Sequence, residues 1–111
     1  LAERRPIHDR VRIENMLQHG NILVTAWAGE LLVGVSRALS DFAFCCYLSD
    51  LAVDESYQKQ GIGKQLIQET HIVSGLQTTL ILLAAPKAAN YYPKIGMDRF
   101  TDCFLIRRKD S

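Results

Sequence analysis

The sequence has little of what marks secreted, membrane-spanning or nucleic-acid-binding proteins. Its three cysteines, Cys45, Cys46 and Cys103, are an odd number with two adjacent, which is a poor framework for disulfides or for a metal site. No stretch approaches the roughly 18 apolar residues that a membrane span needs, and the basic N-terminus lacks the apolar run of a signal peptide. The formal net charge is only +1, so nothing in the overall charge favours nucleic acid or a membrane surface. These absences predict a cytoplasmic protein without a bound metal.

What remains is the composition of one ordinary globular domain. The 111 residues are 48% hydrophobic and 23% charged, with no repeats and no linker. This length and amino-acid composition predict a single domain over residues 1–111 with its own packed core.

Hydrophobic periodicity divides this domain into alternating helices and strands. The expected helices cover residues 6–19, 62–74 and 86–92, and Pro93 is expected to end or kink the last of them. The expected strands cover residues 22–27, 31–39, 44–53, 79–85 and 97–107, the last as either a strand or a hairpin. A hairpin followed by a strand–helix–strand unit predicts a mixed α/β sheet, with one parallel pair and helices on both faces.

One segment between the central strand and the following helix favours a specific chemistry. Residues 58–64 read Gln-Lys-Gln-Gly-Ile-Gly-Lys. Gly61 and Gly63 let a ligand approach the main chain closely, and the first turn of a helix offers unpaired amides at its positive end. Lys59 and Lys64 add positive charge, so the segment predicts an anion site suited to phosphate.

Two familiar nucleotide-binding motifs do not fit this segment. A P-loop has four residues between its glycines and then Lys with Ser or Thr, whereas here only Ile62 separates the glycines and Gln65 follows Lys64. A dinucleotide-binding fingerprint needs a third glycine where this sequence has Leu66. Taken alone, the two glycines are equally compatible with a tight turn that binds nothing.

The flanking residues add a family resemblance. With Leu51-Ala52-Val53 before it, the segment resembles the core motif of the Gcn5-related N-acetyltransferase family, which is Leu-x-Val followed by Gln-x-x-Gly-x-Gly. A second family signature, a Tyr followed four residues later by Gly and a hydrophobic residue, matches Tyr92, Gly96 and Met97. The resemblance implies a mostly antiparallel sheet whose central parallel strands splay around coenzyme A. It also implies an N-acetyltransferase that passes acetyl from acetyl-coenzyme A to a primary amine of a small molecule or protein, by direct attack in a ternary complex.

The resemblance further implies the roles of particular residues. Loop amides would hold the pyrophosphate, the end of the central strand would bind the pantetheine arm and polarise the thioester, and Tyr92 would be the general acid for the leaving thiolate. Tyr91, about a quarter-turn away, is expected to be the buried one of the tyrosine pair. The expected cofactor-binding residues are Leu51, Ala52, Val53, Gln58, Lys59, Gln60, Gly61, Ile62, Gly63, Lys64, Asn90 and Tyr92.

The sequence departs from the family pattern at two positions. Ala85 stands where many relatives have an Asn that contacts pantetheine, and Asn90 is the nearby candidate for that contact. Tyr47 stands where some histone-directed members have a general-base Glu. Asp50 is the candidate base in its place, with Ser49 and a bound water as alternatives.

Other functions stay open at this point. A non-catalytic acyl-coenzyme A sensor on the same fold, or a structural partner domain, is compatible with much of the pattern. The amine acceptor is not identified, and a homodimer is compatible with the sequence. Because no Met begins the sequence and no strand precedes the first helix, we expect the family's first strand and helix, on the order of 30 residues, to be missing before Leu1. The strand over residues 22–27 would then have an unpaired edge.

Overall fold

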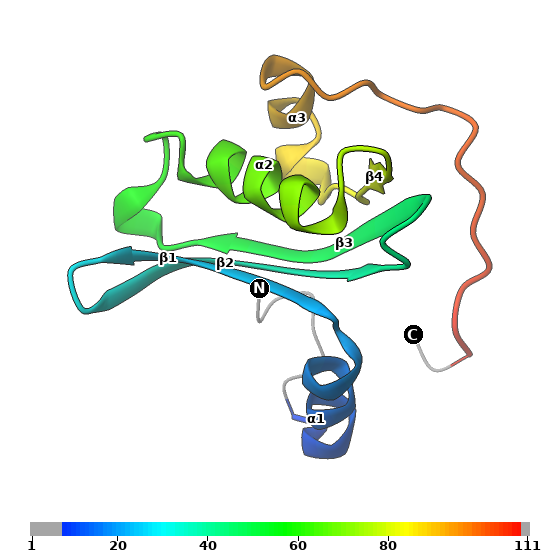
Figure 1. The fold of residues 1–111 in the computed structure, drawn as a ribbon, viewed down its shortest axis with the longest axis horizontal. Coiled ribbons are helices and arrows are strands. Elements are labelled where there is room, and N and C mark those ends of the chain that lie inside the picture. Colours follow the sequence, from blue (N-terminus) through cyan, green and yellow to red (C-terminus); the bar gives the residue numbers. More distant parts are fainter. Residues whose placement is uncertain (1–7, 110–111) are drawn as a thin grey trace.

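The computed structural model describes residues 8–109, which form a mixed α/β fold (Figure 1). A four-stranded sheet in the order β1-β2-β3-β4 has helices on both sides, as predicted, with α2 and α3 on one side and α1 on the other. The helices are α1 (Arg10–His19), α2 (Ile62–Ser74) and α3 (Tyr91–Lys94), with short 3-10 turns at Glu55–Tyr57 and Pro86–Ala88. The strands are β1 (Ile22–Ala28), β2 (Leu31–Ser40), β3 (Cys45–Val53) and β4 (Thr79–Ile81).

The first three strands form an antiparallel sheet. β1 pairs with β2 through the predicted hairpin, and β2 pairs with β3. The β2–β3 register shifts where Arg37 pairs with Asp50 and Ala38 pairs with Leu48, which leaves Ser49 as an extra residue in β3. Among the described strands β1 has no neighbour other than β2. The expectation that elements are missing before Leu1 stays a prediction.

The parallel pair of β3 and β4 is very short. Only three residue pairs join the two strands, from Cys45–Thr79 to Tyr47–Ile81. The predicted strand over 79–85 is therefore too long, because residues after Ile81 leave β3 instead of continuing beside it. From Leu48 to Val53, β3 has no strand partner on that edge within the described residues. The two parallel strands thus diverge, as the resemblance implies.

Helix α2 packs on the sheet through small and hydroxyl-bearing residues. The buried hydroxyls of Ser36 on β2 and Thr70 on α2 are 2.7 Å apart, within hydrogen-bonding distance. On the same helix, the Ser74 hydroxyl lies 2.7 Å from that of Ser40. A Cβ at Gly34 would lie 3.0 Å from the Leu66 side chain, so glycine at this position allows α2 to sit close to β2. These contacts fix where α2 begins relative to β3.

The turn between β2 and β3 is held by one carboxylate. Asp41 accepts hydrogen bonds from the backbone amides of Phe44 at 2.7 Å, Ala43 at 2.8 Å and Cys45 at 3.1 Å. These bonds stabilise the charged form and lower the pKa of Asp41 to about 2. The Gln77 side chain donates to the Phe42 carbonyl at 2.9 Å, which ties the turn to the connection between α2 and β4.

The face of the sheet opposite α2 contains a buried ion pair. Arg37 on β2 and Asp50 on β3 form it, with side chains only 11% and 6% exposed. The same guanidinium donates to the Met16 carbonyl on α1 at 2.7 Å and to the Ser49 hydroxyl at 3.1 Å. Arg37 therefore joins α1, β2 and β3.

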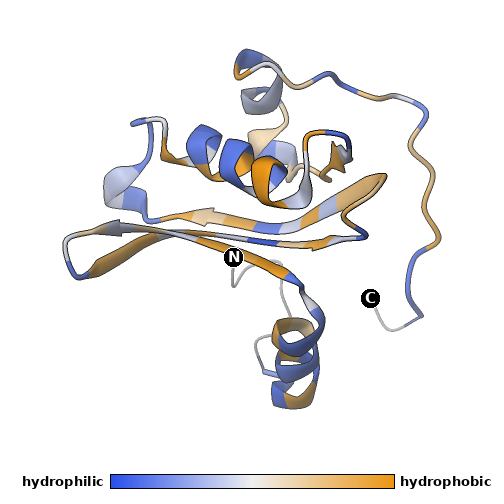
Figure 2. Ribbon diagram, in the orientation of Figure 1, coloured by the Kyte–Doolittle hydropathy of each residue, from blue (hydrophilic) through white to orange (hydrophobic). Residues whose placement is uncertain are grey.

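Both ends of the described chain differ from expectation. α1 begins at Arg10, after Asp9 accepts a capping hydrogen bond from the Arg12 amide; the start predicted at residue 6 lies outside the described residues. The strand or hairpin predicted over 97–107 is wrong, since this segment has no regular structure. Figure 2 shows it as a long trace away from the sheet, and most of its apolar side chains are exposed, Ile106 to 99%. Alternation gives a strand only beside a partner edge, and no described strand pairs with this segment. Within residues 8–109, no helix combines the length and hydrophobicity that crossing a bilayer would require.

The ion pair generates a stability prediction. Asp50→Ala leaves the Arg37 charge buried without its carboxylate, which should lower the free energy of unfolding by about 3–5 kcal/mol. Urea denaturation measures this change. The control is Glu14→Ala, which removes an exposed pair with Arg10 (2.9 Å) and should cost less than about 0.5 kcal/mol. Equal losses for the two variants would contradict the role given to the ion pair.

Candidate active site

The start of α2 offers free backbone amides. The first helical hydrogen bond runs from the Gln65 amide to the Gly61 carbonyl at 3.0 Å. The amides of Ile62, Gly63 and Lys64 therefore have no intrahelical acceptor, and no side chain caps this helix. The end of the helix with the positive dipole thus presents several donors in one direction, as the sequence predicted.

Two residues of the loop have a left-handed backbone conformation. Gly61 has φ 84° and Lys59 has φ 65°. A Cβ at Gly61 would meet nothing within 4 Å, so glycine is needed there for its backbone conformation and not for space. Lys59 adopts this conformation despite its Cβ, which is uncommon for a non-glycine residue. The loop therefore keeps a tight, strained course into α2.

The loop is positively charged and tied to β3. The side chains of Lys59 and Lys64 are exposed, and neither forms an ion pair with any described residue. The Gln58 side chain donates a hydrogen bond to the Val53 carbonyl at 3.1 Å. The lysines are thus available to an anionic ligand, while Gln58 holds the loop against the end of the strand.

The end of β3 leads into this loop through the 3-10 turn at Glu55–Tyr57. Leu51, Ala52 and Val53 are partly buried, and they pair with β2 on one edge only. Their other edge faces the side from which β4 has departed. Main-chain groups on that edge are therefore open to a ligand with amides of its own, beside the free amides at the start of α2.

Helix α3 brings a tyrosine pair to the same end of α2. The Tyr91 and Tyr92 rings contact each other edge to face, with centroids 5.2 Å apart. The Tyr91 hydroxyl lies next to Gly63, where a Cβ would be 3.1 Å from it. The expectation that Tyr91 is buried is wrong, because its side chain lies over the surface of α2 and stays 38% exposed. The helix predicted over 86–92 is wrong, because the chain forms a 3-10 turn at Pro86–Ala88 and then α3. Pro93 lies in the first turn of α3, where its missing amide costs no hydrogen bond.

The other two candidates have partners of their own. Asp50 is buried in the ion pair with Arg37, and the Ser49 hydroxyl accepts from the same guanidinium. The Asn90 side chain is exposed and accepts a hydrogen bond from Arg99 at 3.4 Å. The geometry therefore gives Asp50 a structural contact. The roles predicted for Asp50 and Asn90 stay predictions.

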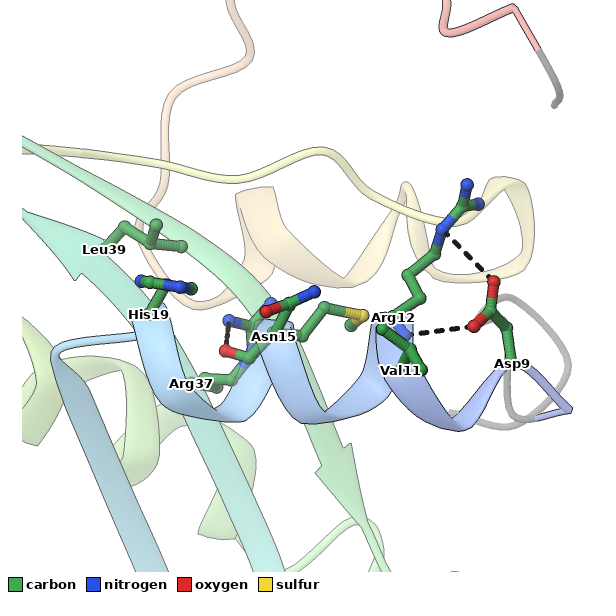
Figure 3. Close-up of a pocket in the computed structure, with 8 residues that line it drawn as sticks. Asp9, Val11, Arg12, Asn15, His19, Arg37 and Leu39 are labelled. Carbon is green, nitrogen blue, oxygen red and sulfur yellow. Dashed lines mark hydrogen bonds and ion pairs between the residues drawn. The ribbon is translucent and has the colours of Figure 1, made fainter.

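Two hollows lie beside the sheet, and the loop borders only the second of them. One of about 470 Å³ lies between α1 and the sheet, where Asn15 and His19 face Arg37 and Leu39 (Figure 3). The other, of about 440 Å³, lies between β1 and α2 and includes Gln60 and Ile62 in its wall. Neither includes Leu51–Val53, so the evidence for a ligand at the loop is the free amides and the open strand edge.

The comparison with known families agrees with this geometry. The sequence model of the acetyltransferase (GNAT) domain matches residues 18–96, which include β3, the glycine loop and both tyrosines. The chain therefore belongs to the GNAT acetyltransferase family.

Relatives of known sequence are acetyltransferases by name. The chain is 29% identical over 98 residues to an uncharacterized N-acetyltransferase, ycf52, of Gracilaria tenuistipitata var. liui, covering 84% of this chain and 53% of that protein. It is 37% identical over 70 residues to histone acetyltransferase TAP1 of Glycine max, covering 60% of this chain and 30% of that protein. The chain thus spans about half or less of the length of these relatives.

Solved structures show the same fold. A GNAT family acetyltransferase of Streptococcus pneumoniae matches with a TM-score of 0.72 and 26% identity, over 89% of this chain and 80% of that one. The aminoglycoside N-acetyltransferase AAC(6')-Iy, solved in complex with coenzyme A, matches with a TM-score of 0.69 and 17% identity, over 93% of this chain and 87% of that one. The second likeness concerns the fold alone.

Proposed function

We propose that this chain binds acetyl-coenzyme A and transfers its acetyl group to a primary amine of a small molecule or protein. The observation that carries the proposal is the uncapped start of α2 beside the open edge of β3. Membership of the GNAT family supports it, and so does the fold shared with a neighbour that was solved with coenzyme A.

The glycine loop would hold the pyrophosphate. Amides from Gln60 to Lys64 supply hydrogen bonds at the positive end of the α2 dipole. Hydrogen bonds to a charged acceptor are stronger than neutral ones. Lys59 and Lys64 add attraction from the exposed side of the loop.

The open edge of β3 would hold the pantetheine arm. This arm contains two amides, which can pair with main-chain groups of Leu51–Val53 much as a β-strand would. A main-chain amide aimed at the thioester oxygen would stabilise the negative charge that develops there during attack. The divergence of β4 supplies the space for this pairing.

The reaction needs one proton donor and one proton acceptor. The amine nitrogen attacks the thioester carbon, a C–N bond forms, the C–S bond breaks, and Tyr92 gives its phenolic proton to the departing thiolate. The attacking amine must lose a proton. Asp50 is the predicted acceptor of that proton, with Ser49 and a bound water as alternatives. Because Arg37 already engages both Asp50 and Ser49, these contacts favour the water.

The cofactor site is tested by a pair of glycine variants. Gly61→Asp places a carboxylate at the loop, where it should repel the pyrophosphate and weaken coenzyme A binding more than about 100-fold, which isothermal calorimetry measures. Gly29→Asp is the matched control, because Gly29 also has positive φ (61° against 84° at Gly61) and equally open surroundings. An unchanged affinity of Gly61→Asp for coenzyme A would contradict the proposed cofactor site.

The general acid is tested by removing one hydroxyl. Tyr92→Phe keeps the ring and should lower kcat by about 100- to 10,000-fold, with little change in the affinity for acetyl-coenzyme A. Release of free thiol during turnover with a panel of amines measures the rate. Tyr57→Phe serves as a control outside the proposed machinery and should leave the rate unchanged. A Tyr92→Phe variant as fast as the wild type would remove Tyr92 from the mechanism.

A further inference from the structure

The contact between α3 and the start of α2 was not expected from the sequence. The Tyr91 hydroxyl would lie 3.1 Å from a Cβ at Gly63, closer than ordinary van der Waals contact. The Val53 side chain also lies close by, 3.9 Å from the same Cβ position at Gly63. Tyr91, Gly63 and Val53 therefore meet where the open edge of β3 reaches the free amides of α2.

The Tyr91 hydroxyl is free to act on a ligand. No described residue forms a hydrogen bond with it, while its ring contacts the ring of Tyr92. Tyr91 as a residue is 38% exposed, so the described residues do not enclose it. A phenol can donate a hydrogen bond, as the neighbouring amides of Ile62, Gly63 and Lys64 can.

We propose that Tyr91 is a further cofactor-binding residue, whose hydroxyl donates a hydrogen bond to the pyrophosphate of coenzyme A beside Gly63. This inference rests on the proposed cofactor site and adds a side-chain donor to its amides. It also explains Gly63, whose φ is not positive and which does not need glycine for its conformation. Glycine at this position leaves room for the Tyr91 hydroxyl.

The two tyrosines then act on different parts of one ligand. Tyr91 would contribute to affinity, because it touches the phosphate end, and Tyr92 to rate, because it touches the sulfur. Tyr91→Phe should raise the KM for acetyl-coenzyme A and leave kcat nearly unchanged, the reverse of Tyr92→Phe.

Calorimetry with two ligands separates binding from a structural role. Tyr91→Phe should lower the affinity for coenzyme A by about 10- to 100-fold, which is the usual effect of losing one hydrogen bond to a charged group. S-acetyl-pantetheine lacks the pyrophosphate, so its affinity should be the same for the variant and the wild type. An equal loss of affinity for both ligands would mean that the substitution only displaces α3. That result would overturn the inference. If neither ligand is weakened, the inference is overturned as well.

A second variant tests the link to Gly63. Gly63→Ala should displace the Tyr91 hydroxyl and lower the affinity for coenzyme A by a similar factor. When Gly63→Ala is added to Tyr91→Phe, the affinity should fall little further. Additive losses would contradict the inference. If the wild type itself fails to bind coenzyme A, the proposed function falls together with the inference. If it binds and Tyr91→Phe binds equally well, the inference alone falls.

Discussion

The buried pair of Arg37 and Asp50 is the interaction on which the arrangement of this domain depends. A guanidinium can be buried only if its charge and its several donors are satisfied. Here the acceptors come from Asp50 and Ser49 on β3 and from the Met16 carbonyl on α1. One side chain on β2 thereby holds β3 in register and attaches α1 to the opposite side of the sheet from α2.

This attachment has a consequence for β3. A strand normally relies on neighbours at both edges, and β4 leaves β3 after only three pairs. β3 nevertheless continues to Val53, because β2 holds it through the ladder and through the ion pair. The domain can therefore leave one edge of a central strand open without losing the strand, and an open edge of fixed shape is what a ligand with its own amides requires.

The position of α2 follows from a different set of contacts. Gly34 and the hydroxyls of Ser36 and Ser40 bring the helix close to β2. With its axis fixed there, the free amides of its first turn lie at the end of β3. The two halves of the proposed site, strand edge and helix start, are thus positioned by β2, which contributes no ligand-binding residue to the proposal.

Some of this could be predicted from the sequence and some could not. The boundaries of α2 follow from local chemistry, since Gly61 and Gly75 supply the positive-φ residues just before and just after it. The length of β4 depends on where its neighbour diverges, which no local pattern encodes. The alternating segment over 97–107 likewise needs a partner edge before it can become a strand.

The candidate site shows the same division. The loop motif was readable because glycine spacing and lysine positions are local. The contact between Tyr91 and Gly63 was not, because it depends on how α3 lies over α2. The partner of Asp50 could not be read locally either, because Arg37 lies on another strand. Contacts between elements decide which polar residues are free to act on a ligand.

The proposed cofactor site is tested most directly by following backbone amides in solution. In ¹H–¹⁵N NMR spectra, titration with coenzyme A should move the amide signals of Ile62, Gly63 and Lys64 most strongly, because their N–H groups would bind the pyrophosphate. Signals of Leu51–Val53 should move with them as the pantetheine arm pairs with β3. Shifts confined to the hollow at α1, around Asn15 and His19, or no shifts at saturating ligand, would contradict the proposed site.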